Sequence, residues 1–494
     1  MSAELAVLLT LVIYKLVLVG VGLWASRLNH TETDFLLGGR ALGPWVAGLS
    51  YAASTSSAWV LLGFSGFLYA VGLSALWMVP GILGGYVVMW VWFGPRMRAE
   101  SAAENQVTLG DFLAARAKGT GRTAILWVGA LLVLFCFIFY IAAQFGAASI
   151  AFENQFGLGR LESVLVGAGI ILIYSLLGGF WAVSVTDTLQ GAMMALIAVL
   201  LPVLTLIAAG GPAEVWTTLQ ASAPAGYLSL TGDRAFFIFI GFALGGAGIG
   251  LGTFGQPQLM SRLMAVKDDA ARKRAFAVSI GWGVIVYAGM ITLALSGRAL
   301  LGAGQEGEAL FYTLAAELLP PVLAGIIIAA VLSAVMSTVD SLLVATSAAV
   351  AHDMGVSARY PGREVMISRI VMAALCAAAV VMALAIPATI FDRVLFSWSA
   401  LGAAFGPIVV ARVARVEPAT GAILAAMALG FGMSALFFLI RGMGLEGTGG
   451  MGGFLAGLAA LPGSPFERVV PWFIPLLLVF TWRRKAAPAS QEVS

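Results

Sequence analysis

Apolar stretches of about 20 residues follow one another along nearly the whole chain, with only short polar segments between them. A membrane-spanning helix needs about 20 consecutive apolar residues, so each stretch is a candidate span. Only 10% of the residues are charged, which is too few to cover a water-facing surface and excludes a soluble enzyme. We therefore predict an all-α polytopic membrane protein with about thirteen transmembrane helices. The predicted spans are 5–26, 44–69, 73–95, 122–149, 161–180, 186–209, 236–257, 275–298, 320–346, 366–386, 390–413, 418–440 and 467–482.

The positions of the basic residues test this division into spans. With the N-terminus outside, 20 of the 27 Lys and Arg residues fall in cytoplasmic loops or in the C-terminal tail, and six fall in outside loops. The positive-inside rule predicts such an asymmetry, and one missed or extra span would scramble it downstream. We therefore predict a multi-pass protein of the bacterial cytoplasmic membrane, with the N-terminus outside and the C-terminus inside.

The sequence also limits the energy source and the partners. No Walker A motif is present, so we expect no use of ATP, and a net charge of +3 gives no indication of nucleic-acid binding. The run 250–255 matches the GxGxxG pattern but lies inside an apolar span, where a dinucleotide site is not expected. The expected partners are the lipid bilayer and a small-molecule substrate, with no organic cofactor.

Two predicted spans do not read as uniform helices. The span 44–69 contains a cluster of hydroxyl-bearing residues at 50–59, and the span 236–257 contains a glycine-rich run at 245–257. Such runs free backbone groups at bilayer depth, which is tolerated only where protein or a water-filled cavity covers them. Interrupted helices at corresponding places in two halves indicate the central site of a transporter. The alternative is that small residues only allow close helix packing.

One face of the span 320–346 is rich in oxygen atoms. Ala334, Ser337, Thr338 and Ser341 share this face at helical spacing, and Asp340 lies next to it. Carbonyl and hydroxyl oxygens suit a cation of sodium size, although the hydroxyls could instead bond their own helix. A carboxylate at mid-membrane depth is costly and usually functional.

A second acidic residue, Asp187, has two interpretations. It could cap a helix N-terminus, with Gln190 completing a capping box, or it could hold an ion. Asp187 and Asp340 could also form the carboxylate dyad of an intramembrane aspartyl protease. The Tyr-Asp and Gly-x-Gly-Asp motifs that such a protease requires are missing.

Three further residues have both a structural and a functional interpretation. Arg40 could anchor the cytoplasmic side of the membrane or take part in gating. Trp59 and Tyr140 could be interfacial or packing side chains or could contact a substrate.

Several segments, in order along the chain, together resemble the sodium/solute symporter family, most closely its bacterial sodium/proline symporter branch. The matching segments are 36–44, 178–190, 254–257 with Arg262, 334–338 and 402–407. The resemblance implies the LeuT-like fold, a five-helix inverted repeat in a single membrane transport domain. It would place a preceding helix at 5–26, repeat one at 44–209, repeat two at 236–413 and additional helices at 418–482.

The resemblance also implies roles for individual residues, with Na⁺ as the coupling ion. The implied sodium-binding residues are Ala53, Ser56, Ala334, Ser337 and Thr338, the first three through backbone oxygens and Ser337 and Thr338 through their hydroxyls. A candidate second cation site comprises Asp187, Asp340 and Ser341, with Ser337 nearby. The implied substrate-binding residues are Ser57, Trp59, Tyr140, Ile249, Thr253 and Pro257. Arg40 and Thr55 are the implied gating or coupling residues.

Three positions depart from the proline branch. Thr55 stands where the branch has an aspartate, and Ile249 and Thr253 stand where it has aromatic residues. The expected function is a secondary active symporter, not an enzyme, that couples inward sodium flow to uptake of a small organic solute by alternating access. An amino acid such as proline is the expected solute. The alternatives are proton coupling and a different solute such as betaine or choline, a monocarboxylate or a vitamin.

Overall fold

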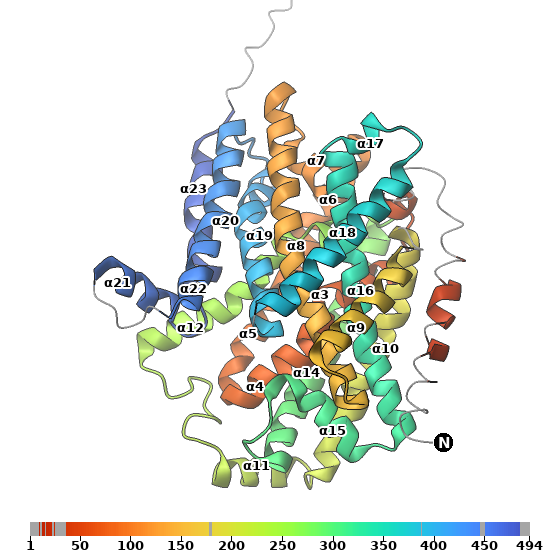
Figure 1. The fold of residues 1–494 in the computed structure, drawn as a ribbon. Helices are drawn as coiled ribbons and strands as arrows, with labels where there is room; N and C mark the ends of the chain where they lie inside the picture. Colours follow the sequence, from red (N-terminus) through yellow and green to blue (C-terminus); the bar gives the residue numbers. More distant parts are fainter. Residues whose placement is uncertain are drawn as a thin grey trace, which may run out of the picture.

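The computed structural model describes residues 36–484, except 177–179, 387 and 445–449, together with residues 9, 12–14, 16–21 and 24. The predicted span 5–26 therefore lies largely outside the described residues. The described chain folds into helices, and its β-structure is limited to two isolated bridges, Leu42 with Val266 and Pro418 with Arg483. Figure 1 shows these helices as one bundle.

Nine helical stretches of the described chain are long and apolar enough to cross a membrane. The first of them, Pro44–Ala103, contains two predicted spans and is built from several shorter pieces. Its pieces are α3 (Pro44–Ala58), η2 (Trp59–Phe64), α4 (Ser65–Val71), η3 (Gly72–Trp77), α5 (Met78–Val87), η4 (Val88–Phe93) and α6 (Gly94–Ala103). The other long helices are α8 (Gly119–Phe156), α10 (Phe180–Ala208), α14 (Asp269–Leu301), α16 (Pro321–Ala348), α18 (Glu364–Ala385), α19 (Ile390–Val413) and α20 (Thr420–Gly442). The remaining stretch joins α12 (Phe236–Gly248) to the 3₁₀ segment η5 (Ile249–Gly255).

Shorter helices connect or cap the long ones. They are η1 (Gly38–Arg40), α7 (Leu109–Ala114), α9 (Arg160–Ser175), α11 (Pro212–Ser222), α13 (Pro257–Ala265), η6 (Gly307–Ala309), α15 (Leu310–Leu318), η7 (Ala349–Asp353), α17 (Val356–Arg359), α21 (Gly450–Ala459), α22 (Pro465–Arg468), η8 (Val470–Trp472) and α23 (Phe473–Thr481). Within the described residues, each predicted span from 44–69 onward overlaps helical structure, and most helices extend beyond the apolar stretch. In α14 the extension begins where the Asp268 carboxylate caps the helix by accepting from the Ala271 amide at 2.7 Å.

The interrupted spans lie at the centre of the bundle. The helix α3 packs against α10, α14 and α16, while η5 packs between α5 and α19. In both views α6 and α17 lie toward one end of the bundle, where Figure 1 also shows α7, and α11 and α15 lie at the other. We call these the α7 end and the α15 end.

Close backbone contacts explain part of the glycine-rich run. A Cβ atom on Gly250 would lie 1.9 Å from the Gly81 carbonyl oxygen, and one on Gly255 would lie 2.0 Å from the Leu401 carbonyl oxygen. Real Cβ atoms do not approach so closely, so only glycine allows η5 to pack against α5 and α19. The close-packing interpretation is therefore correct for these glycines, and it coexists with the interruption of the helix described below.

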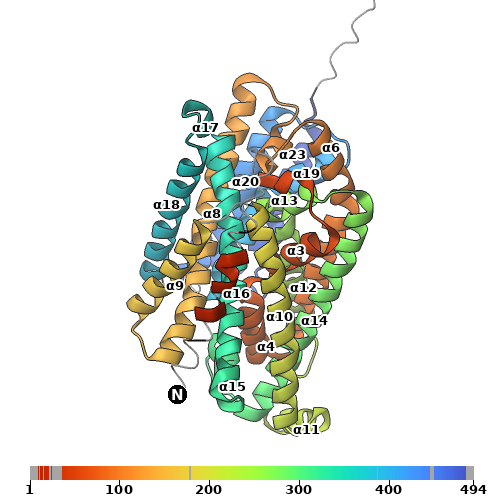
Figure 2. The same ribbon diagram turned by 90° about the vertical axis from the view of Figure 1, so that its right-hand side faces the viewer.

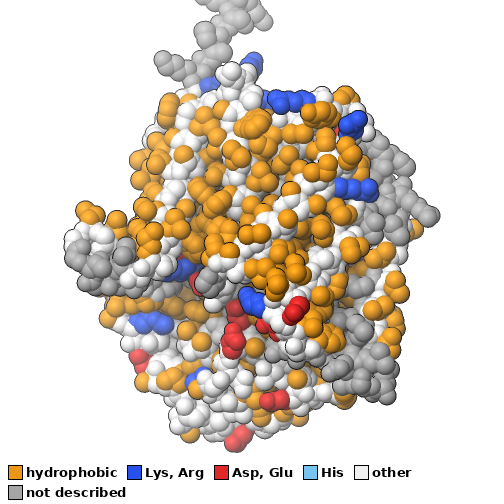
Figure 3. All heavy atoms as spheres, in the orientation of Figure 1, with side chains coloured by type: hydrophobic (Ala, Val, Ile, Leu, Met, Phe, Trp, Pro, Cys, Tyr) orange, Lys and Arg blue, Asp and Glu red, His pale blue; other side chains and the backbone are white. Residues whose placement is uncertain are grey.

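The surface carries its charges unevenly. On the face shown in Figure 3, hydrophobic side chains cover most of the bundle, Lys and Arg lie along the upper edge and at several places in the lower half, and acidic side chains appear mainly in the lower half. The upper edge is the α7 end, so the charge asymmetry is the one expected if that end is cytoplasmic. Arg262, which the sequence places in a loop, and Arg412, at the end of the predicted span 390–413, are both buried, with 1% and 2% of the residue exposed, respectively.

Candidate functional site

The helix α3 breaks at Ser57. This residue has φ of 45° and ψ of −170°, and the chain continues as the π-helical segment η2. A non-glycine residue in such a conformation is strained and persists only where its surroundings hold it. Here the Gln144 side chain of α8 accepts a hydrogen bond from the Ala58 amide at 3.3 Å and donates one to Ser57 Oγ at 3.5 Å. The predicted interruption of the span 44–69 is confirmed.

The second interruption lies at Gln256. The segment η5 is a 3₁₀ helix, Gln256 is extended with φ of −90° and ψ of 109°, and α13 starts at the next residue. The Gln256 side chain donates to the Gly252 carbonyl at 3.2 Å, and the Thr253 hydroxyl donates to the Gly250 carbonyl at 2.7 Å. Thr253 therefore directs its hydroxyl to its own backbone. Both halves of the molecule thus carry a discontinuous helix, as predicted.

The predicted sodium residues of α16 lie level with the break in α3. The two helices run in opposite directions, because α3 leads toward α4 at the α15 end while α16 leads from α15 to α17. Ser54 of α3 contacts Ser341 of α16, with 2.9 Å between their hydroxyl oxygens. One helical turn toward the α15 end leads from Ser341 to Ser337 and from Ser54 to Ala58. The oxygen-rich face is therefore level with the break in α3.

The hydroxyls on this face differ in their partners. Ser337 donates to the Ala334 carbonyl at 3.1 Å, whereas Thr338 Oγ1 is buried and has no hydrogen-bond partner within the described part of the chain. Ser56 directs its side chain toward Tyr86 of α5, with 3.3 Å between the two oxygens. Ala53 is fully buried. The assignment of these residues to a sodium site stays a prediction.

A buried ion pair lies one turn further toward the α7 end. Asp187 of α10 and Arg262 of α13 are both almost fully buried, and 3.0 Å separates Arg262 Nη2 from Asp187 Oδ2. Ser50 and Ser54 of α3 donate to the same carboxylate oxygen at 2.7 and 3.2 Å. Arg262 Nη2 also donates to Ser341 Oγ at 2.6 Å. One carboxylate thus joins α3, α10, α13 and α16.

The surroundings of the two membrane carboxylates contradict three interpretations. Asp187 lies inside α10, which begins at Phe180, so the helix-capping interpretation with Gln190 is wrong. Asp340 accepts a hydrogen bond from Ser175 of α9, so it faces a different neighbour from Asp187. The structure does not bring the three residues of the candidate second cation site together: Asp187 and Ser341 meet, and Asp340 points away from them. The carboxylates also do not form a protease dyad.

The predicted substrate residues are spread over the core. The Tyr140 hydroxyl lies beside Ser57 and the Trp398 side chain of α19. Ile249 and Trp59 are each 1% exposed, and the Trp59 ring lies 6.2 Å from that of Phe391. Pro257 instead borders a cavity near the α7 end.

Two cavities approach the core from opposite ends. The cavity at the α15 end has a volume of about 470 Å³ and is bordered by Phe67 and Phe391, whose rings stack 4.8 Å apart. Phe391 separates it from Trp59. The cavity at the α7 end has a volume of about 40 Å³, room for about three water molecules. The α15 end is therefore the more open of the two.

The two predicted gating residues have clear structural contacts. Arg40 follows two glycines, and all three residues have positive φ. Its guanidinium donates to the hydroxyl and the carbonyl of Ser101 in α6, to the Gln106 carbonyl after α6 and to the Met264 carbonyl of α13. Arg40 thus joins segments at the α7 end. The Thr55 hydroxyl donates to the Tyr51 carbonyl of its own helix at 2.6 Å.

Sequence reasoning missed three residues of the site. Gln144 supports the broken helix, and the signal for it is an amide one helical turn after Tyr140 within a strongly apolar span. Arg262 was assigned to a cytoplasmic loop, although its position within a matched motif segment could have indicated a role. Trp398 carries no signal in the sequence, because an aromatic residue in an apolar span is ordinary.

Comparison with known proteins gives a consistent result. A family model described as the sodium:solute symporter family matches residues 35–430. The osmoregulated proline transporter OpuE of Bacillus subtilis (strain 168) is 31% identical over 418 residues, covering 83% of this chain and 83% of its own length. The sodium/proline symporter of Escherichia coli (strain K12) is 30% identical over 463 residues, covering 89% and 91%.

Solved structures agree on the fold. A Na⁺-coupled sialic acid symporter in a substrate-bound outward-open state superposes with a TM-score of 0.73 at 18% identity, covering 97% of each chain. Mhp1, a nucleobase-cation-symport-1 family transporter, has a TM-score of 0.55 at 13% identity, covering 91% of this chain and 94% of its own. These likenesses confirm the predicted LeuT-like fold, and the family consists of transporters and not of proteases. With its two discontinuous helices and a family match over most of its length, this chain belongs to the sodium:solute symporter family.

Proposed function

We propose that the protein couples inward sodium flow to uptake of proline or a similar small amino acid across the bacterial cytoplasmic membrane. Family membership supports sodium-coupled solute transport. The names of the relatives from Bacillus subtilis and Escherichia coli support proline as the solute. Ile249 and Thr253, which stand where the proline branch has aromatic residues, make the pocket less aromatic, so a related amino acid belongs in the same test.

The observation that carries the proposal is the buried Thr338 hydroxyl level with the break in α3. A buried hydroxyl without a partner is costly unless a ligand or water satisfies it. The Ala53 and Ser56 carbonyls next to the break, the Ala334 carbonyl and the two hydroxyls would surround a sodium ion with oxygen atoms. The Ser56 carbonyl accepts from the Trp59 amide and the Ala334 carbonyl accepts from Ser337, but a carbonyl oxygen has a second lone pair for an ion. A sodium ion there would tie α3 to α16 and thereby hold the substrate pocket in shape.

The Asp187 carboxylate supports a second cation near the first. Asp187 Oδ2 is shared by Ser50, Ser54 and Arg262, while Asp187 Oδ1 is buried and has no hydrogen-bond partner among the described residues. A buried carboxylate oxygen of this kind favours a cation or an ordered water. Ser341 would complete such a site, and Asp340 is excluded from it by its contact with Ser175.

The two cavities support alternating access between the two sides. The proposed sites lie between a wider cavity at the α15 end and a narrow one at the α7 end. Sodium can drive uptake only if it binds one conformation more tightly than the other. Sodium bound between α3 and α16 would favour the conformation open at the α15 end. Substrate binding would then allow one group of helices to move against the other.

Uptake of labelled proline into proteoliposomes tests this proposal. Sodium and proton gradients are imposed separately, and a panel of small amino acids, betaine and monocarboxylates competes for uptake. The double variant S337A/T338A should lose sodium-stimulated uptake, because both hydroxyl ligands are removed. The matched control is T346A on the same helix, where the hydroxyl bonds only its own backbone. Unchanged sodium dependence in S337A/T338A would contradict the sodium site, and uptake driven by protons alone would contradict sodium coupling.

A further inference from the structure

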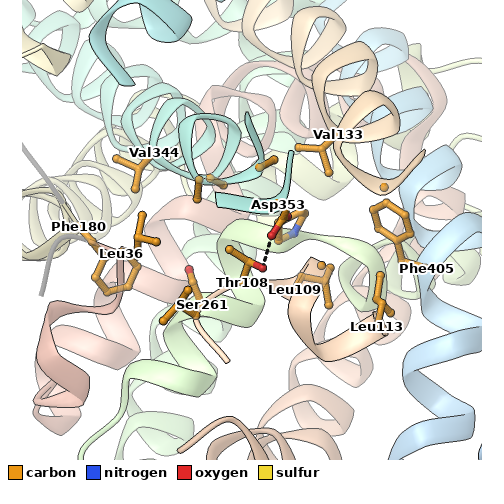
Figure 4. A pocket seen from close by; sticks show the side chains of 17 residues that line it. Leu36, Thr108, Leu109, Leu113, Val133, Phe180, Ser261, Val344, Asp353 and Phe405 are labelled. Atoms are coloured by element: carbon orange, nitrogen blue, oxygen red, sulfur yellow. Dashed lines mark hydrogen bonds between the residues drawn. The ribbon is translucent and has the colours of Figure 1, made fainter. Parts of the chain in front are cut away.

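A contact between α7 and η7 closes the narrow cavity at the α7 end. Pro257 of α13 borders this cavity. Figure 4 shows Ser261 of α13 on the same cavity as Thr108 and Asp353. Thr108 precedes α7, and Asp353 is the last residue of η7, which continues α16. The Thr108 hydroxyl donates to Asp353 Oδ1 at 2.6 Å. The side chains that meet here come from segments 245 residues apart.

A second pair of contacts holds the same two elements together. Asp111 of α7 bonds His352 of η7, with 2.9 Å between Oδ2 and Nε2, and Arg122 of α8 donates to Asp111 Oδ1 at 2.6 Å. Burial alone would raise the pKa of Asp111, but the hydrogen bond and charge of His352, the Val107 amide and Arg122 together lower it below its usual value. Asp111 is therefore an ionised acceptor that attaches α7 to both η7 and α8.

The backbone of α7 is also shaped for this close approach. A Cβ atom on Gly110 would lie 2.4 Å from Asp353 Oδ2 and 2.7 Å from its carboxyl carbon. Any other residue at this position would push Asp353 away or separate α7 from η7. Two independent features therefore support the contact with Asp353. Thr108 donates a hydrogen bond to it, and Gly110 has no side chain that would block it.

We infer that the contact of Thr108 and Gly110 with Asp353 is the inner gate of the transport path. The inference rests on the proposed function, since it concerns the release of solute toward the cytoplasm. The cavity is about 40 Å³, which admits water but no amino acid, so solute can leave past Pro257 only if α7 separates from η7. Opening the gate breaks the bond between Thr108 and Asp353, and closing it restores that bond.

Accessibility of a single cysteine at Ser261 tests the gate without requiring transport. The background replaces the two natural cysteines, Cys136 and Cys376, by alanine. Ser261→Cys is then labelled with a membrane-impermeant thiol reagent in inside-out and in right-side-out vesicles. In the otherwise unchanged chain, labelling from the cytoplasmic side should be slow.

Two independent variants should open the gate. T108V removes the hydrogen bond to the Asp353 carboxyl group, and G110V inserts a side chain against Asp353, so each should speed cytoplasmic labelling of Ser261→Cys by about tenfold or more. T108S keeps the hydroxyl and should restore slow labelling. The control T123V removes an exposed hydroxyl at the same end that bonds only its own helix, and it should leave the rate unchanged.

The outcomes separate this inference from the proposed function. Fast labelling in T108V and G110V with slow labelling in T108S and T123V supports the gate. Unchanged labelling in both T108V and G110V overturns it, as does labelling that occurs only in right-side-out vesicles. Sodium dependence of uptake is measured separately, so its loss would refute the coupling mechanism while leaving the labelling result valid.

Discussion

Breaking the buried ion pair between Asp187 and Arg262 should be among the most destabilising changes in this protein. The two charges are 3.0 Å apart and almost fully buried. At an effective dielectric constant of 20 their attraction is about 5.5 kcal/mol. Removing one partner leaves the other charge buried and unpaired, which costs roughly 3–5 kcal/mol. We therefore expect D187N and R262Q each to lower the free energy of unfolding by about that amount.

The double variant makes this prediction specific. D187N/R262Q removes both charges and leaves two neutral groups that can hydrogen bond. Its loss of unfolding free energy should therefore be smaller than the sum of the losses in D187N and R262Q. We expect a coupling free energy of at least about 2 kcal/mol. The measurement is denaturant unfolding in detergent micelles, followed by tryptophan fluorescence of all four proteins of the cycle.

A surface pair of similar length provides the control. Lys273 and Asp269 are 3.2 Å apart, but their side chains are 71% and 45% exposed. Solvent screens such a pair, and its coupling free energy should not exceed about 0.5 kcal/mol. Equal coupling in the two cycles, or strictly additive effects of D187N and R262Q, would refute the argument that burial makes the Asp187 pair strong.

Two further predictions concern packing and the broken helix. G81A places a Cβ atom 2.1 Å from the Ala247 carbonyl oxygen and should destabilise the protein by about 1–3 kcal/mol or more. The control G84A adds a Cβ atom on the same helix where space is open, so it should be neutral or slightly stabilising. Thermal unfolding in detergent compares the two variants, and equal melting temperatures would contradict the packing geometry. Q144L leaves the Ala58 amide buried without its acceptor, so it should lower the free energy of unfolding by about 1–3 kcal/mol. It should also lower the apparent affinity for solute in uptake assays. Unaltered uptake kinetics in Q144L would show that the amide at the break finds another partner.

Features that depend on local sequence were predictable because each follows from its own stretch of chain. Apolar runs of bilayer length specify the helices from 44 onward, since backbone groups in lipid must be satisfied within the segment. The breaks at Ser57 and Gln256 occur within the hydroxyl cluster at 50–59 and the glycine-rich run at 245–257, whose residues weaken a continuous helix. The shared face of Ser337, Thr338 and Ser341 follows from helical periodicity alone.

Partners across the bundle could not be predicted in the same way. Asp187 and Asp340 look equivalent as carboxylates in apolar spans, yet one meets Arg262 and the other meets Ser175. On α16, Asp340 and its neighbour Ser341 point about 100° apart, because adjacent residues on a helix differ in direction by this angle. Ser341 therefore faces Asp187 while Asp340 faces α9, and which helix lies on each side depends on the packing around α16. Arg262 reads as a loop residue because it lies between the predicted spans 236–257 and 275–298, and only the packing of α13 buries it.

The sequence by itself determined a bundle of membrane helices, its family and the two interrupted helices, because apolar length, residue chemistry and helical spacing act locally. Only the tertiary structure decided which polar groups meet: Gln144 with the break at Ser57, Asp187 with Arg262, and Thr108 with Asp353. These pairs join segments far apart in the chain. Their partners are chosen by the packing of whole helices, since each buried polar group must find a partner among the neighbours that packing supplies.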